Sequence, residues 1–218
     1  MTCAAAPAPG FGRRRSGNGL VAPIIYYVRH GLTDWNVQQR LQGRHDVALN
    51  HQGRAQSVCC GKILRDLMSR DGRTAAEFDY VSSPLVRARK TTELMRETLG
   101  LPPGDYRVEP RLAEIAFGEW EGLTYAEVLA RDKGVVARRE SDKWGFLPPG
   151  GESYAQVSSR VAQWHASVAI DTVVAAHGGT ARALIAHLAL APPEEAANYS
   201  IDQGVVYVFT GKQIARYG

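Results

Sequence analysis

The chain is poor in cysteine and has no long apolar run. Its three cysteines, Cys3, Cys59 and Cys60, are an odd number, and two of them are adjacent. This pattern excludes a small disulfide-stapled scaffold and favours a reducing compartment, so we expect a cytoplasmic protein. No apolar stretch approaches the roughly 18 residues of a membrane span. The arginines at 13–15 are followed by no apolar segment, so neither a membrane anchor nor a secretory signal is expected.

A strong excess of one charge is also missing. The 218 residues carry a formal net charge of +4, and residues 1–23 contain three arginines and no acidic residue. The remainder is therefore nearly balanced, with 23 basic and 22 acidic side chains, and does not indicate a nucleic-acid-binding surface. Residues 1–23 are rich in Ala, Pro and Gly without periodicity. We expect a disordered tail there and a single domain over 24–218.

Apolar runs and helical periodicity alternate along this domain. Buried strands are predicted at 24–28, 78–83 and 172–176, an edge strand at 106–110, and a closing hairpin at 205–209 and 213–217. Helices are predicted at 51–70, 84–99, 124–131, from 153 through the apolar positions 157, 161, 164 and 168, and at 181–190. This alternation predicts a three-layer α/β fold, with a mostly parallel sheet and helices on both faces.

Two of the predicted buried strands end in the same way. The first leads into Arg29-His30-Gly31, and the strand at 172–176 leads into His177-Gly178-Gly179. Because functional sites in open α/β sheets form at the carboxyl ends of the strands, we expect both histidines at one edge. The glycines allow close approach of a ligand, and helix N-termini there favour an anion.

Arginines accompany the two histidines. Arg87 follows the strand at 78–83, so Arg29 and Arg87 can each offer a planar guanidinium to phosphate oxygens. Histidine at a divalent metal site is usually joined by carboxylate or thiolate ligands, so we expect phosphate and no metal. A lone histidine at a strand end is most often structural, and the residue pattern alone does not single out Glu114 from Glu119 and Glu121.

Four motifs in order resemble one known family. They are RHGLTDWN at 29–36, SSPLVRARKT at 82–91, LAEIAFGEWEG at 112–122 and AHGGTAR at 176–182, and PPGGES at 148–153 is similar to a sequence in the small phosphatases of that family. Together they resemble the histidine phosphatase superfamily, in its phosphoglycerate mutase-like branch. The resemblance implies the phosphoglycerate mutase-like form of the three-layer fold.

The resemblance also implies roles for individual residues. His30 would be the nucleophile that becomes phosphohistidine, and Glu114 the proton donor. Arg29, Arg87 and His177 would hold the phosphoryl oxygens, with help from Asn36 and the backbone N–H of Gly178. No cofactor and no metal is implied, and the expected partner is a small phosphorylated metabolite. Gln42, Trp144 and Phe146 are candidates for the substrate pocket by their position alone.

Three functions are compatible with this resemblance. The segment between Gly122 and the PPGGES motif has only about 25 residues, shorter than the insertion of cofactor-dependent mutases, so the small phosphatases, among them the α-ribazole phosphatases, are favoured. A phosphoglycerate mutase and a catalytically silent phosphate-binding or regulatory protein are the alternatives. Basic residues in this segment are interpreted as a solvated helix face: Arg131, Lys133, Arg138, Arg139 and Lys143. Both a monomer and a homodimer are open.

Overall fold

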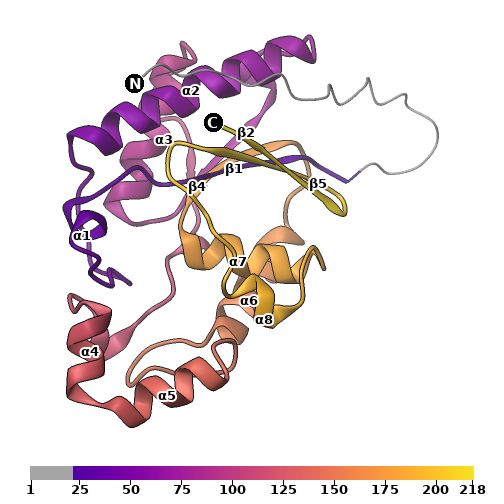
Figure 1. Cartoon of the computed structure of the whole chain (residues 1–218). Helices are drawn as coiled ribbons and strands as arrows, with labels where there is room; N and C mark the ends of the chain where they lie inside the picture. The colour runs from indigo at the N-terminus through magenta and orange to yellow at the C-terminus, as the bar shows by residue number, and fades with distance from the viewer. Residues whose placement is uncertain (1–21) are drawn as a thin grey trace.

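The computed structural model describes residues 22–218. The predicted disordered tail, residues 1–23, lies almost wholly outside this range. Within it the chain forms an α/β fold in which a central sheet lies between two layers of helices (Figure 1), as expected from the sequence. No helix of the described residues is both long enough and apolar enough to cross a membrane.

The sheet has six strands in the order β3-β2-β4-β1-β5-β6. Their bounds are β1 (Ile25–Arg29), β2 (Asp79–Ser82), β3 (Arg107–Val108), β4 (Thr172–Ala176), β5 (Val206–Thr210) and β6 (Gln213–Tyr217). Strands β3, β2, β4 and β1 are parallel, whereas β5 is antiparallel to β1 and β6 is antiparallel to β5. The predicted edge strand and closing hairpin are therefore confirmed, and the hairpin extends the sheet beside β1.

Helices α2 and α3 cover one face of the sheet, and α6 and α7 cover the other (Figure 1). The helix bounds are α1 (Asp34–Val37), α2 (His51–Arg70), α3 (Val86–Thr98), α4 (Tyr125–Arg131), α5 (Lys133–Ser141), α6 (Tyr154–His165), α7 (Gly178–His187) and α8 (Pro193–Ala196). Successive residues of a strand point to opposite faces. Accordingly, Tyr26 and Val28 pack in the α2 and α3 layer, whereas Ile25 and Tyr27 pack in the α6 and α7 layer.

Several helix starts follow the sequence signals. Asn50 accepts from the N–H of Gly53 at 2.9 Å and caps α2. Ser153 caps α6 in the same way, with its hydroxyl 3.3 Å from the backbone N of Gln156. These side chains satisfy N–H groups that have no partner inside the helix, so the predicted starts at 51 and 153 agree with the structure.

Other helix boundaries differ from the predicted ones. α3 begins at Val86 and not at Pro84, and its first N–H donates to the Asp46 carboxylate at 2.8 Å. α7 begins three residues earlier than predicted, at Gly178, because glycine has weak helix propensity and hides a helix start. α6 ends at His165, which leaves Val168 beyond the helix but still packed against the core.

A small separate cluster lies between α4 and α5, which Figure 1 shows away from the sheet. Val128 of α4 and Val135 and Val136 of α5 pack there with Trp120, whose ring stacks on Phe146 at a centroid distance of 5.5 Å. No bounds were predicted for α5, although the basic residues of this segment were interpreted as a helix face. Phe146, which was a candidate for the substrate pocket by its position, therefore packs in this cluster.

Candidate active site

The carboxyl ends of β1, β2 and β4 bring the predicted histidines together. His30 donates its backbone N–H to Ala176 at 2.9 Å, and Ser83 donates to Ala175 at 3.0 Å, so the ladder continues to the end of each strand. The imidazole rings of His30 and His177 then lie 5.1 Å apart between centroids. The convergence expected from the sequence is confirmed.

His30 is 2% exposed and is held in one orientation by two contacts. Its Nδ1 lies 2.8 Å from the carbonyl oxygen of Gly31, so Nδ1 carries the proton and donates there. Its Nε2 accepts from Nε of Arg87 at 3.3 Å. Burial, reinforced by the positive charges of Arg87 and Arg29, lowers the pKa of His30 well below 6.5. The ring is therefore neutral, with the Nε2 lone pair facing the cationic groups.

Arg87 is fully buried and points its guanidinium toward His30. Its Nη1 donates to the carbonyl of His45 at 2.6 Å and its Nη2 to that of Gly43 at 2.8 Å. These partners are neutral, and no carboxylate of the described residues lies within ion-pair distance of Arg87. Its positive charge is left available to an anion beside His30.

Arg29 contributes a second guanidinium. Its Nη1 donates to the carbonyl of Ile201 at 2.8 Å, while its Nε is buried without a hydrogen-bond partner among residues 22–218. A Cβ built on Gly178 would lie 3.7 Å from that Nε, so the orphan donor faces the start of α7. Buried donors are normally satisfied, and an anion at this point would satisfy Arg29 Nε.

His177 stands immediately before α7. Its Nε2 lies 2.6 Å from Oγ of Ser83, and that Oγ accepts from the N–H of Leu85 at 3.3 Å. Nδ1 of His177 is buried and has no hydrogen-bond partner among the described residues. Burial, followed by the charge of Arg87, lowers the pKa of His177 well below 6.5.

The fold distinguishes the three glutamates of the 112–122 segment. Oε1 of Glu114 accepts from the backbone N–H of Gly179 and of Ile115, both at 2.9 Å, which places the carboxylate at the N-terminus of α7. Oε1 of Glu121 instead accepts from the N–H of Arg44 at 3.0 Å, and Glu119 is exposed. Only Glu114 of the three therefore contacts the segment that carries His177.

The remaining predicted residues lie in different places. Asn36 closes the cap of α1, with its Oδ1 accepting from Thr33 N at 3.2 Å and from Nε2 of Gln203 at 2.9 Å. Gln42 is 7% exposed, and its Oε1 has no partner among residues 22–218. It precedes Gly43, whose carbonyl holds Arg87. Sequence reasoning missed Ser83 and Gln203, although Ser83 lies within one of the recognised motifs.

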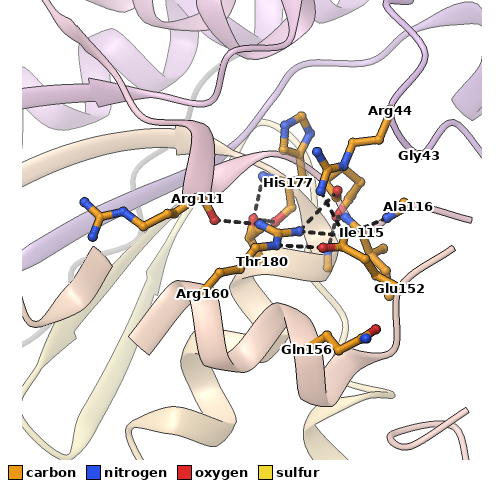
Figure 2. Close-up of polar contacts among 12 residues, drawn as sticks. Gly43, Arg44, Arg111, Ile115, Ala116, Glu152, Gln156, Arg160, His177 and Thr180 are labelled. Atoms are coloured by element: carbon orange, nitrogen blue, oxygen red, sulfur yellow. Dashed lines mark hydrogen bonds and ion pairs between the residues drawn. The ribbon is translucent and has the colours of Figure 1, made fainter. Parts of the chain in front are cut away.

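A charged network supports the segment that carries Glu114 (Figure 2). Arg160 of α6 donates through Nε and Nη2 to the two carboxylate oxygens of Glu152, each at 3.1 Å, and through Nη2 to the carbonyl of Glu114 at 3.3 Å. Glu152 also accepts from Arg44 at 3.0 Å and from the backbone of Ala116 at 3.1 Å. Glu152 belongs to the PPGGES motif, to which the sequence assigned no individual role.

The site thus combines neutral imidazoles, unpaired cations and one carboxylate at a helix N-terminus. Two guanidinium groups and the first N–H groups of α7 favour an anion between them. A neutral imidazole nitrogen such as Nε2 of His30 is chemically able to act as a nucleophile, and a carboxylate such as that of Glu114 is able to carry a proton. This set of groups suits the transfer of a phosphoryl group.

Comparison with known proteins agrees with this geometry. The family model described as histidine phosphatase superfamily (branch 1) matches residues 25–214. Glucosyl-3-phosphoglycerate phosphatase of Mycobacterium tuberculosis (strain ATCC 25618 / H37Rv) is 37% identical over 192 residues, which cover 88% of this chain and 71% of that protein. A 2,3-bisphosphoglycerate-dependent phosphoglycerate mutase 2 of Gloeobacter violaceus is 29% identical and covers 85% of this chain and 84% of that protein.

Solved structures show the same fold. The structure of mycobacterial glucosyl-3-phosphoglycerate phosphatase in complex with VO3 superposes with a TM-score of 0.73 at 32% identity, covering 89% of this chain and 96% of that one. The α-ribazole phosphatase of Shigella flexneri has the same TM-score of 0.73 at 24% identity, over 88% and 93% of the two chains. The expected family and fold are confirmed: the chain belongs to branch 1 of the histidine phosphatase superfamily and is a phosphoric monoester hydrolase.

Proposed function

We propose that the protein is a metal-independent phosphatase that hydrolyses a small phosphomonoester through a phosphohistidine on His30. The observation that carries this proposal is the neutral Nε2 of His30 beside two arginines, neither of which forms an ion pair with a carboxylate of the described residues. Such a site attracts a phosphate dianion and presents a lone pair to its phosphorus atom.

In the first step Nε2 of His30 attacks phosphorus, and the bond between phosphorus and the ester oxygen breaks. The protonated carboxyl of Glu114 gives its proton to the leaving oxygen through Oε2, since Oε1 is bound to the N–H groups of Gly179 and Ile115. The charge of the transferred group is stabilised by Arg29 and Arg87. The in-line, loose transition state makes such positioning and charge stabilisation the main source of rate.

In the second step a water molecule replaces the alcohol. The Glu114 carboxylate accepts one proton from this water, whose oxygen attacks phosphorus as the bond to Nε2 of His30 breaks. Inorganic phosphate leaves, and Glu114 is again protonated. The orphan N–H group of Arg29 Nε and the imidazole of His177 are suited to hold the phosphoryl oxygens in both steps, with the backbone of Gly178. The protein itself supplies the positive charge, so no step uses a metal.

The substrate we propose is a small phosphorylated metabolite, and glucosyl-3-phosphoglycerate is the first candidate because the 37% identical relative carries that name. We further propose that the protein acts in the cytoplasm, where such metabolites occur. The phosphoglycerate mutases among its relatives make mutase activity the competing outcome.

The test is hydrolysis of 4-nitrophenyl phosphate by the purified protein in EDTA. His30→Ala should lower kcat by at least about 10⁴-fold, as removal of a nucleophile does, whereas the exposed His51 at the start of α2 can be replaced by alanine without loss. Acid-labile phosphate should be trapped on the wild type and not on His30→Ala. Wild-type turnover by His30→Ala would refute the mechanism. Formation of 2-phosphoglycerate from 3-phosphoglycerate faster than phosphate release would make the protein a mutase.

A further inference from the structure

A third arginine borders the phosphate site. Arg182 lies four residues after Gly178 and therefore on the same face of α7. A Cβ built on Gly178 would lie 3.4 Å from Nη1 of Arg182 and 3.7 Å from Nε of Arg29. Two guanidinium groups thus flank one glycine. Arg29 is proposed to hold the transferred phosphoryl group, and Arg182 lies beside it, farther along the helix.

Lys143 is held next to Arg182 by adjacent residues. Nζ of Lys143 donates to Oδ1 of Asn198 at 2.6 Å, and Nε of Arg182 donates to the carbonyl of Tyr199 at 2.9 Å. Two adjacent residues of the segment after α8 therefore anchor both cations. Lys143 is half-buried, and burial, followed by the charges of Arg139 and Arg182, lowers its pKa. Its interpretation as part of a solvated helix face is wrong.

Two stacked aromatic residues, Trp144 and Tyr154, connect the neighbourhood of Lys143 with Arg182. Trp144, the neighbour of Lys143, stacks on Tyr154 with ring centroids 5.8 Å apart and planes inclined by 12°. The hydroxyl of Tyr154 lies 3.3 Å from Nη1 of Arg182. Trp144, a pocket candidate by sequence position, therefore links the chain after α5 to the cation on α7.

No carboxylate of the described residues forms an ion pair with either cation of this pair. Within residues 22–218 no acidic side chain lies within 4.0 Å of Arg182 or Lys143, whereas nearby Arg139 is paired with Glu140 at 2.8 Å. Neighbouring cations repel one another, and a half-buried pair without an anion is costly unless a ligand supplies the negative charge. The neutral partners Asn198 and Tyr199 orient the pair without using up its charge.

We propose that Arg182 and Lys143 form a second anion subsite, which binds a carboxylate or second phosphate carried by the leaving group of the substrate. This inference rests on the proposed function and narrows its substrate to acidic phosphomonoesters. Glu114, the proposed donor to the leaving oxygen, binds the N–H of Gly179 at the start of the same helix. A group attached to that oxygen would thus lie near the start of α7, from which Arg182 is within reach along the helix.

The test compares two substrates that differ in one charge. 3-Phosphoglycerate carries a carboxylate where glycerol 3-phosphate carries a neutral hydroxymethyl group. The wild type should favour 3-phosphoglycerate in kcat/KM by about 10- to 100-fold, the range of one charge-assisted hydrogen bond. Arg182→Gln should bring that ratio near one, and Lys143→Gln should lower it by about 3- to 10-fold. The ratio of kcat/KM for fructose 1,6-bisphosphate to that for fructose 6-phosphate gives the same comparison for a second phosphate. The larger of the two ratios shows whether the subsite prefers a phosphate or a carboxylate.

Arg65→Gln provides the matched control, because it removes one positive charge from the exposed surface of α2, on the other face of the sheet. The ratio should not change in this variant. If the ratio of kcat/KM is near one for both substrate pairs in the wild type, the subsite is refuted. It is also refuted if Arg182→Gln leaves these ratios unchanged.

Binding gives a readout that does not need turnover. In the His30→Ala background, calorimetry should show weaker binding of 3-phosphoglycerate after Arg182→Gln, by about the same factor as kcat/KM. Loss of this binding in a protein that hydrolyses no phosphomonoester would support the subsite and refute the proposed function. Turnover of 4-nitrophenyl phosphate, together with equal kcat/KM for 3-phosphoglycerate and glycerol 3-phosphate, would support the proposed function and refute the subsite. Thermal melts confirm that each variant is folded.

Discussion

Replacing Arg160 by methionine tests the support beneath Glu114. Arg160 binds both carboxylate oxygens of Glu152 at 3.1 Å and donates through Nη1 to the carbonyl of Arg111 at 2.6 Å. Methionine keeps an apolar stem of similar length but removes every donor of the guanidinium. Of the partners within residues 22–218, Glu152 would retain Arg44 and the N–H of Ala116.

The size of the effect follows from the burial of the ion pair. The side chains of Arg160 and Glu152 are 16% and 22% exposed, which lies between a surface pair and a fully buried one. Exposed pairs contribute about 0–1 kcal/mol, and breaking a buried pair costs about 3–5 kcal/mol. We expect a loss of about 2 kcal/mol in the free energy of unfolding, which lowers Tm by about 4–8 °C in a protein of this size.

The same substitution should impair proton donation. Without Arg160 the backbone of Glu114 loses a contact at 3.3 Å, and a small displacement of a catalytic group can cost about 10²-fold in rate. Alkyl phosphates need a proton on the leaving oxygen, whereas 4-nitrophenolate leaves with little help. We expect kcat to fall about 10- to 100-fold for glycerol 3-phosphate and by about threefold or less for 4-nitrophenyl phosphate.

Arg73→Met supplies the control for this comparison. Arg73 also pairs with carboxylates, those of Asp171 and Glu77, but it lies at the amino end of β4, away from the site. It should lower Tm without changing the dependence on the leaving group. Equal losses with both substrates in Arg160→Met, or an unchanged Tm, would refute the role assigned to Arg160.

Two further predictions concern the protonation of His30 and His177 and the position of the Glu114 carboxylate. Burial keeps His30 and His177 neutral in the folded protein, whereas the unfolded chain binds protons at both below about pH 6.5. The free energy of unfolding should therefore fall with decreasing pH, by up to about 2.7 kcal/mol per pH unit, in urea titrations between about pH 7.5 and 5; a flat profile would contradict this. Gly179→Ala places a methyl group 2.3 Å from Oε1 of Glu114 and should lower kcat for alkyl phosphates about 10-fold or more. Gly104→Ala, which meets no atom within 4 Å, should leave kcat unchanged, and equal kcat in the two variants would argue against the position assigned to the carboxylate.

Much of the fold could be predicted because its signals are local. The apolar runs of β1 and β4 identify buried strands, and capping residues such as Asn50 and Ser153 mark helix starts. Boundaries were missed where the cap comes from elsewhere. Asp46 satisfies the first N–H of α3 from 40 residues away, and no pattern near Val86 reveals that contact.

The sequence alone determined the six strands and the main helices in their order along the chain, because these depend on short-range periodicity. It also placed His30 and His177 at the carboxyl ends of strands, because functional sites of parallel sheets form there. Tertiary structure decided how the other groups meet them. The backbone N–H of Gly179 selects Glu114 from a segment 65 residues away. The chain after α8 brings Lys143 to Arg182 through Asn198. Such contacts join residues far apart in the sequence, so their geometry exists only once the chain has folded.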